Sequence, residues 1–177
     1  MTRRELFATA TIAPLLLWAF PSAAAETVLI AEFSPSGGPL GSRRLAKVAR
    51  PDAEWRKLLT PIEYEVTRQA GTERAFSGAT WNNHADGLYR CICCGTALYD
   101  SRTKFESGTG WPSFWRPIAR TNVVEKDDRS WIEDRTAVSC ALCDAHLGHV
   151  FDDGPQPTGL RYCMNSAAMR FVPRAAA

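Results

Sequence analysis

Four of the six cysteines in this sequence form two C-x-x-C pairs. Each pair is followed by small or polar residues, which suit a tight turn that brings two thiolates onto one metal ion. Two such turns can make a closed tetrahedral site, which is the arrangement typical of structural zinc. The sequence therefore predicts a four-cysteine zinc site whose ligands are Cys91, Cys94, Cys140 and Cys143.

Three other arrangements of these cysteines compete with the four-thiolate site. The second pair continues toward His146 and His149 at metal-ligand spacing, so it could bind an ion alone, although the first pair would then have no role. The pairs could form disulfides in an oxidising compartment. One pair could also be a thioredoxin-like redox couple, although no βαβ pattern surrounds either pair. We favour the four-thiolate site because it uses both pairs.

Cys163 lies outside both pairs, in a short strand-like stretch near the end of the chain. An isolated cysteine in a β domain is often a buried, inert side chain. Here Arg161 and Asn165 lie two residues to either side, and positions two apart on a strand share a face. A cation, a thiol and an amide on one face indicate a reactive thiolate site rather than a core.

The elements that must position these groups are mostly short strands. Asp52 could cap a short helix, and Thr60, Pro61 and Glu63 predict a better-capped helix directly after it. Beyond residue 72 the helical period disappears, and short apolar or alternating stretches are separated by turn residues. We expect the stretch Lys126–Ser130 to be a hairpin connection. The sequence thus predicts a mainly antiparallel β domain over residues 52–177 that begins with short helices.

Residues 1–25 have the features of an export signal. Arg3 and Arg4 precede a short apolar run, Ala8–Phe20, and Ala23–Ala25 offers a cleavage pattern of small residues. The paired arginines favour a twin-arginine signal over an ordinary secretory one. The run is short for a bilayer span, so no stable membrane anchor is expected. We expect a periplasmic protein in which residues 26–51, rich in glycine and proline, form an extended, loosely held N-terminal arm.

The 177-residue chain carries a net charge of only +2, and its basic residues are scattered along the sequence. This pattern argues against a nucleic-acid partner, which requires a concentrated basic surface.

Four longer motifs resemble those of the B-type methionine sulfoxide reductases and occur in the family's order. They are Tyr89–Cys94, Lys104–Phe114, His146–Pro155 and Arg161–Ser166. The resemblance implies two facing antiparallel sheets (a β-tent-like fold) and a Cys₄ zinc away from the active site. It also implies an oxidoreductase that reduces methionine R-sulfoxide, free or in oxidised proteins.

The resemblance also implies roles for individual residues. Those expected around the reacting atoms are the nucleophile Cys163 together with His146, His149 and Asn165. Those expected to complete the substrate pocket are Trp111, which would receive the S-methyl group, Phe151 and Arg161.

Sulfoxide reduction needs a soft nucleophile at sulfur and a proton on the departing oxygen. Lowering a thiol pKa by about two units yields a gain of only about threefold in rate near pH 7, because nucleophilicity falls as the thiolate fraction rises. A general acid contributes about 10²–10⁴-fold. We therefore expect the acid, supplied by His146 or His149, to matter more than the thiol pKa.

The sequence departs from a common version of the family pattern at Thr109. Many members carry a resolving cysteine there, so the resemblance leaves the recycling route open. Cys93 is the remaining free thiol, but it lies between two predicted metal ligands, and we expect an external thioredoxin-like dithiol to act instead. Two other functions were weighed: a non-enzymatic, zinc-stabilised ligand-binding module and a general thiol–disulfide exchanger.

Overall fold

The computed structural model of the protein describes residues 26–129 and 134–175. Two helices, α1 (Asp52–Leu58) and α2 (Pro61–Gln69), precede most of the strands. The strands are β1 (Thr27–Phe33), β2 (Pro39–Ala46), β3 (Gly87–Cys91), β4 (Ala97–Asp100), β5 (Lys104–Phe105), β6 (Ser113–Phe114), β7 (Val123–Arg129), β8 (Asp134–Cys140), β9 (His146–Phe151), β10 (Arg161–Met164) and β11 (Met169–Pro173). Three 3₁₀ turns, η1 (Ser101–Thr103), η2 (Arg120–Asn122) and η3 (Ser166–Ala168), connect some of them.

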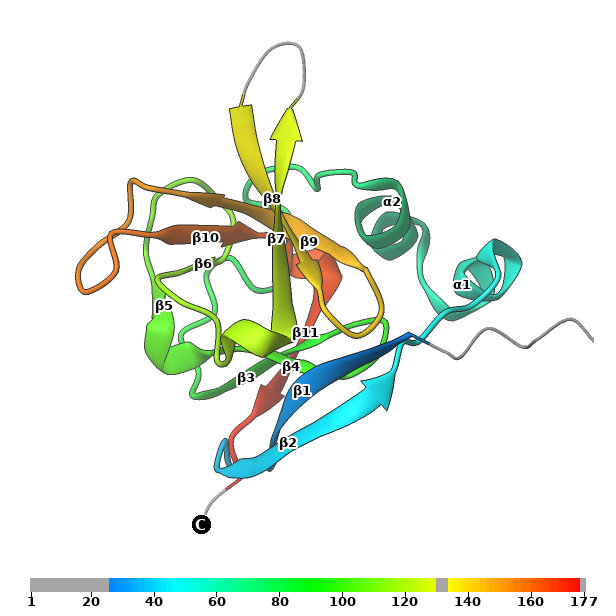
Figure 1. Ribbon diagram of the computed structural model, residues 1–177. Coiled ribbons are helices and arrows are strands. Elements are labelled where there is room, and N and C mark those ends of the chain that lie inside the picture. The colour runs from blue at the N-terminus through cyan, green and yellow to red at the C-terminus, as the bar shows by residue number, and fades with distance from the viewer. Residues whose placement is uncertain (1–25, 130–133, 176–177) are drawn as a thin grey trace, which may run out of the picture.

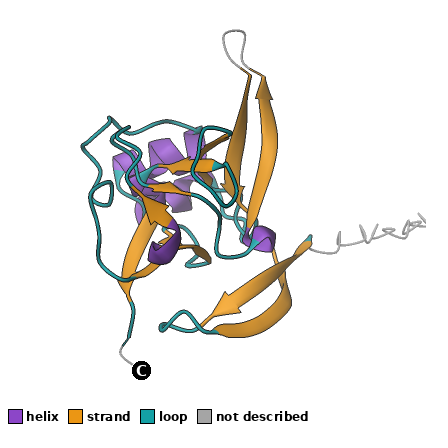
Figure 2. Ribbon diagram, turned by 90° about the vertical axis from the view of Figure 1, so that its left-hand side faces the viewer, coloured by secondary structure: helices purple, strands orange, loops and turns teal. Residues whose placement is uncertain are grey.

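Two larger antiparallel sheets form the body of the domain. One has the order β5-β6-β10-β9-β8-β7 and the other β11-β3-β4, and Figures 1 and 2 show both. Their aromatic side chains meet in the core, where Phe114 of β6 stacks on Tyr99 of β4 at 4.4 Å and contacts Tyr89 of β3 at 4.9 Å. All three rings are fully buried. The predicted mainly β fold is confirmed.

Helix α2 begins where the sequence predicts. The Thr60 amide donates to the Glu63 carboxylate at 2.8 Å, the Glu63 amide donates back to the Thr60 hydroxyl at 3.4 Å, and Pro61 occupies the first turn. This reciprocal capping satisfies two amides that the helix leaves unpaired. The helix buries Val66 against the main core, and both helices lie together on one side of the domain (Figure 1).

Residues 27–46 form a β-hairpin, not the loosely held arm that their glycines and prolines suggested. Strands β1 and β2 pair from Thr27↔Ala46 to Phe33↔Pro39, and Ile30 is buried in the main core. The fully buried Asn122 attaches the hairpin, because its amide group pairs with both the N–H and the C=O of Ala31, each at 2.9 Å. Strand pairing and the bonds to Asn122 give a regular structure to a segment whose composition alone indicates a loop.

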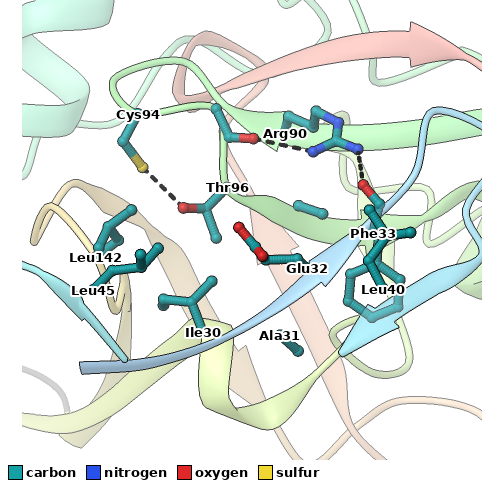
Figure 3. Close-up of a pocket in the computed structure, with 12 residues that line it drawn as sticks. Ile30, Ala31, Glu32, Phe33, Leu40, Leu45, Arg90, Cys94, Thr96 and Leu142 are labelled. Carbon is teal, nitrogen blue, oxygen red and sulfur yellow. Dashed lines mark hydrogen bonds between the residues drawn. The ribbon is translucent and has the colours of Figure 1, made fainter. Parts of the chain in front are cut away.

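Arg90 adds a second attachment between the hairpin and the sheet β11-β3-β4. Its guanidinium donates to the Phe33 carbonyl at 2.9 Å and to the Gly95 carbonyl at 3.3 Å, and Figure 3 shows it spanning the two segments. Ile30, Leu45 and Leu142 line the cavity of about 270 Å³ beneath it. The hairpin therefore lies beside the turn that carries Cys94.

Strand β7 is longer than predicted. Lys126 and its neighbours up to Arg129 pair with β8 as far as Arg129↔Asp134, so the expectation that the hairpin connection starts at Lys126 is wrong. These two strands project from the body of the domain (Figure 1). Because they project into solvent they carry charged residues, and the alternation of apolar and polar residues that marks a strand is lost. The proposed signal, residues 1–25, lies outside the described residues. Within the described ranges, no helix is long and apolar enough to cross a membrane.

Candidate functional site

Four cysteine sulfurs converge where the two larger sheets meet. The Sγ atoms of Cys91, Cys94, Cys140 and Cys143 all lie within 4.8 Å of one another. The Cys94–Cys140 sulfurs are 3.5 Å apart and the Cys91–Cys143 sulfurs 3.6 Å. Zn–S bonds of about 2.3 Å place the sulfurs of a tetrahedral site about 3.8 Å apart. These thiols are not joined as disulfides, and they could hold a metal ion.

The two cysteine pairs have the same local geometry. In the β3–β4 turn the Gly95 amide donates to the Cys91 carbonyl at 2.9 Å, and in the β8–β9 turn the Asp144 amide donates to the Cys140 carbonyl at 3.0 Å. Gly95 and Asp144 both have positive φ, 78° and 57°, a conformation that glycine and aspartate tolerate better than most residues. Repetition of the same turn in two different sheets is typical of a paired metal knuckle.

A second candidate site lies around Cys163, on the central part of the larger sheet. Cys163 of β10 pairs with Ser113 of β6 on one side and with His149 of β9 on the other. Directly paired residues share a face of a sheet, so the thiol, the hydroxyl and the imidazole emerge together. Gly148 allows this close approach, because a Cβ there would clash with the Cys163 carbonyl oxygen.

A cavity of about 130 Å³ opens over this face. Its walls combine two aromatic rings, those of Trp111 and Phe151, with polar groups beside the thiol. The lining residues are Thr72, Trp111, Arg135, Gly148, His149, Phe151, Cys163, Met164 and Asn165. Five of the seven residues that the family resemblance assigned to catalysis or substrate binding therefore meet at one cavity.

Burial raises the pKa of the Cys163 thiol above its ordinary value, and the Arg161 charge and the Thr109 and Ser113 hydroxyls oppose this effect. The Thr109 hydroxyl oxygen lies 4.0 Å from Sγ. Ser107 links the two hydroxyls, at 2.8 Å from each. The resting thiol is therefore largely protonated near pH 7, and the hydroxyls can donate to a thiolate that forms.

The two histidines occupy different environments. His149 lines the cavity, and its Nε2 lies 3.2 Å from the Asp128 carboxylate. His146 is only 7% exposed and lies behind it, with the ring centroids 5.2 Å apart. Burial, with a smaller effect of His149, lowers the pKa of His146 to about 4. His146 is thus neutral near pH 7, and among the described residues it does not contribute to the cavity wall.

Arg161 flanks the cavity rather than lining it. Its guanidinium makes two bonds of 2.7 Å to the Asp153 carboxylate and lies 4.4 Å from the Phe151 ring centroid. The two contacts hold the cation behind the aromatic wall. From there its positive charge acts to lower the pKa of the Cys163 thiol, while the side chain stays out of the cavity.

Glu73 contacts several parts of the site, although sequence reasoning assigned it no role. Its amide donates to the Asn165 side-chain oxygen at 3.0 Å, and its carbonyl accepts the Trp111 indole N–H at 3.1 Å. Its buried carboxylate accepts the amides of Ser166 and Ala167 at 2.6 and 2.8 Å. One residue therefore fixes the aromatic wall, the amide and the start of η3. An acidic residue shortly after the predicted helix is the only local signal that the sequence offers for it.

Comparison with known proteins identifies the family. A family model described as the SelR domain matches residues 59–173. The chain belongs to the peptide methionine sulfoxide reductase B family. A relative named peptide methionine sulfoxide reductase MsrB from Herminiimonas arsenicoxydans is 57% identical over 125 residues, which cover 71% of this chain and 91% of the relative.

Two further reductases show the breadth of the similarity. The chloroplastic peptide methionine sulfoxide reductase B1 of Arabidopsis thaliana is 61% identical over 118 residues, covering 66% of this chain and 58% of its own. The MsrB of Pseudomonas fluorescens is 55% identical over 130 residues, covering 73% of this chain and all of its own, 100%. This methionine sulfoxide reductase is therefore an oxidoreductase, and the enzyme interpretation is confirmed. The β1–β2 hairpin precedes the part that the SelR model matches.

Replacing any one of the four clustered cysteines with serine should remove the metal and unfold the domain together. A structural zinc ion contributes about 10–16 kcal/mol in small zinc-folded peptides, which is comparable to the whole stability of a domain, about 5–15 kcal/mol. Metal analysis and thermal unfolding of the purified variants measure both effects. Cys93→Ser is the matched control within the same turn and should keep metal and fold. A ligand variant that retains the wild-type metal content would refute the site.

Alkylation of Cys163 should accelerate with pH, with its midpoint above the ordinary thiol value of about 8.5, because the folded pKa is raised. Arg161→Met removes a charge that lowers this pKa, so alkylation at pH 7.5 should slow about threefold for each unit by which the pKa rises. The rate is measured by mass spectrometry of the Cys163 peptide. Asp153→Asn keeps the cation and is the control. Equal slowing in both variants would contradict an electrostatic role for Arg161.

Proposed function

We propose that this enzyme reduces the R epimer of methionine sulfoxide by direct attack of Cys163 on the sulfoxide sulfur. The observation that carries the proposal is the single cavity in which the Cys163 thiol, the His149 imidazole and the Asn165 amide face the Trp111 and Phe151 rings. A polar side and an apolar side next to a nucleophile match the oxygen and the methyl group of the substrate.

This two-sided cavity also supports selectivity for one epimer, and the family resemblance implies that it is the R epimer. A sulfoxide sulfur carries an oxygen, a methyl group, the rest of the methionine chain and a lone pair. If Trp111 and Phe151 hold the methyl group and His149 and Asn165 face the oxygen, only one epimer presents its sulfur to Cys163 with the chain directed out of the cavity. The same separation of walls disfavours the other epimer.

In the proposed step the Cys163 sulfur attacks the substrate sulfur and forms an S–S bond, while the sulfoxide oxygen takes up a proton. The S–S bond and the substrate S–O bond then break as the hydroxyl group passes to the Cys163 sulfur. Methionine leaves, reduced by two electrons, and Cys163 becomes a sulfenic acid, oxidised by two. The thiol supplies the proton that balances the reaction.

His149 is the group we assign to the proton transfer. It lines the cavity, it lies across the ladder from Cys163, and the Asp128 carboxylate orients its ring. His146, which the family resemblance also assigned to catalysis, would instead pack as a neutral ring behind His149. The pKa of the Cys163 thiol is raised, and His149 is held in place by Asp128. Both features agree with the expectation that proton transfer to the sulfoxide oxygen contributes more to the rate than a lowered thiol pKa would.

Zinc is the ion that we propose for the four-cysteine cluster. Four thiolates with tetrahedral spacing and no open position are the donor set of structural zinc. The ion would join the turn of one sheet to the turn of the other. None of its ligands lines the cavity at Cys163 in the described part of the chain, so its role would be to hold the fold.

Recycling would use an external dithiol of the thioredoxin kind. One thiol of that partner would displace hydroxide from the Cys163 sulfenic acid as water, and the second would break the mixed disulfide, returning Cys163 as a thiol and leaving the partner oxidised. Thr109, with its hydroxyl 4.0 Å from the Cys163 sulfur, cannot form a disulfide. Cys93 packs against the Trp55, Leu59 and Tyr64 cluster beside the metal ligands. Export through a twin-arginine signal in residues 1–25, toward the periplasm, completes the proposal.

Cys163→Ser should abolish sulfoxide reduction while metal content and melting temperature stay at the wild-type values. The serine hydroxyl cannot act as the soft nucleophile, whereas the cysteine lies outside the metal cluster. The assay follows reduction of a dabsylated methionine R-sulfoxide with dithiothreitol, with the S epimer as the stereochemical control. Residual turnover comparable to wild type would exclude Cys163 as the nucleophile, and equal reduction of both epimers would exclude the proposed selectivity.

Cys93→Ser should complete many turnovers as wild type does when a thioredoxin-like dithiol is supplied. The reason is that the proposed recycling needs no second cysteine of this chain. Single-turnover and steady-state rates, with mass spectrometry of the oxidised enzyme, measure it. A variant that stalls after one turnover, together with a Cys93–Cys163 disulfide in oxidised wild type, would show that Cys93 is the resolving residue.

A further inference from the structure

Phe76 is an exposed aromatic residue held in an unfavourable backbone conformation. Its side chain is 56% exposed, and its φ is +65°. Bulky residues rarely adopt positive φ, and such strain persists where the surroundings impose it, often at functional sites. Within the described residues, it is the one aromatic among the exposed large hydrophobic side chains; the others are Leu29, Leu40, Leu58 and Ile62.

Contacts with the Gly110–Trp111 segment hold Phe76 in place. Its amide donates to the Gly110 carbonyl at 2.8 Å, and a Cβ on Gly110 would lie 2.8 Å from the Phe76 ring. The edge-to-face partner of the ring is Trp81, with centroids 5.2 Å apart at 84°. The Phe76 ring therefore lies beside Gly110, the residue before Trp111 of the cavity wall. Most of the ring surface faces solvent.

The size of the cavity requires substrate contacts outside it. A volume of about 130 Å³ is below the roughly 300–1,000 Å³ of pockets that enclose a whole small ligand. Only the end of a methionine sulfoxide side chain fits, so the remainder of a protein substrate must lie across the surface around the opening. Thr72 lines the cavity, and Phe76 follows on the same loop.

We propose that Phe76, supported by Trp81, binds an apolar side chain next to the oxidised methionine in the substrate polypeptide. The inference rests on the proposed function of the Cys163 cavity and specifies its substrate class. The exposed ring offers apolar area to a neighbouring leucine, valine or phenylalanine, and burial of that area lowers KM.

The test compares three sulfoxide substrates with dithiothreitol as the reductant. They are N-acetyl-methionine R-sulfoxide, a pentapeptide with leucine on both sides of the sulfoxide, and the same peptide with serine there. Phe76→Asn removes the ring, and asparagine tolerates the left-handed conformation, so the fold is kept. Phe76→Tyr retains a ring. Leu58→Ala, at a site 60% exposed on α1, is the control for loss of exposed apolar surface.

Wild type should prefer the leucine peptide over the serine peptide. In Phe76→Asn this preference should disappear, because KM for the leucine peptide should rise about tenfold. A rise of this size corresponds to the loss of roughly one exposed ring contact. Turnover of N-acetyl-methionine R-sulfoxide should stay within twofold, and Phe76→Tyr and Leu58→Ala should keep the preference.

Three results would overturn the inference. An unchanged peptide preference in Phe76→Asn would show that the ring does not contact substrate. A fall in kcat that is equal for all three substrates would show that Phe76 acts by positioning Trp111. Inactivity of the wild-type enzyme toward every substrate would overturn the proposed function itself, and this inference with it.

Discussion

Four cysteine sulfurs within 4.8 Å of one another repel strongly once they are deprotonated, and burial prevents water from screening them. A cation removes this conflict, and the cluster then binds two sheets together. Cys91 and Cys94 belong to the turn of the sheet β11-β3-β4, whereas Cys140 and Cys143 begin the turn into β9. Since β9 carries His149 and Phe151, the position of two walls of the cavity depends on the cluster.

The position of β9 in turn fixes the nucleophile Cys163, because β9 pairs with β10. Glu73 fixes the loops on the other side of the cavity. The register β6-β10-β9 places Cys163 between Ser113 and His149. The segment after α2 then closes the other side, because the Glu73 backbone bonds both Trp111 and Asn165. Asn165 has little freedom left, since its amide nitrogen also donates to the Leu147 carbonyl at 3.1 Å. Hydrogen bonds to main-chain groups therefore preorganise the Trp111 and Asn165 side chains.

The parts of the site that sequence could predict are those with a local signature. Two C-x-x-C pairs, the Thr60–Glu63 capping box and the Cys163 neighbourhood each lie within a few residues, so spacing alone is informative. Glu73 and Asp128 act through hydrogen bonds to residues 21 or more positions away, which no periodicity records. Burial is likewise a tertiary property. The sequence could not separate the neutral His146 from His149, although the two are only three positions apart.

Asn122 shows how firmly the N-terminal hairpin belongs to the rest of the molecule. This fully buried side chain bonds Ala31 of the hairpin through both amide atoms and also donates to the Ala97 carbonyl at 2.8 Å. If the hairpin detached alone, the Asn122 amide would lose two partners, at a cost of about 1–3 kcal/mol for each polar group left buried and unpaired. The hairpin, although it precedes the family domain, is therefore coupled to the domain, and the paired amides of β1 should exchange with solvent more slowly than those of an unattached tail.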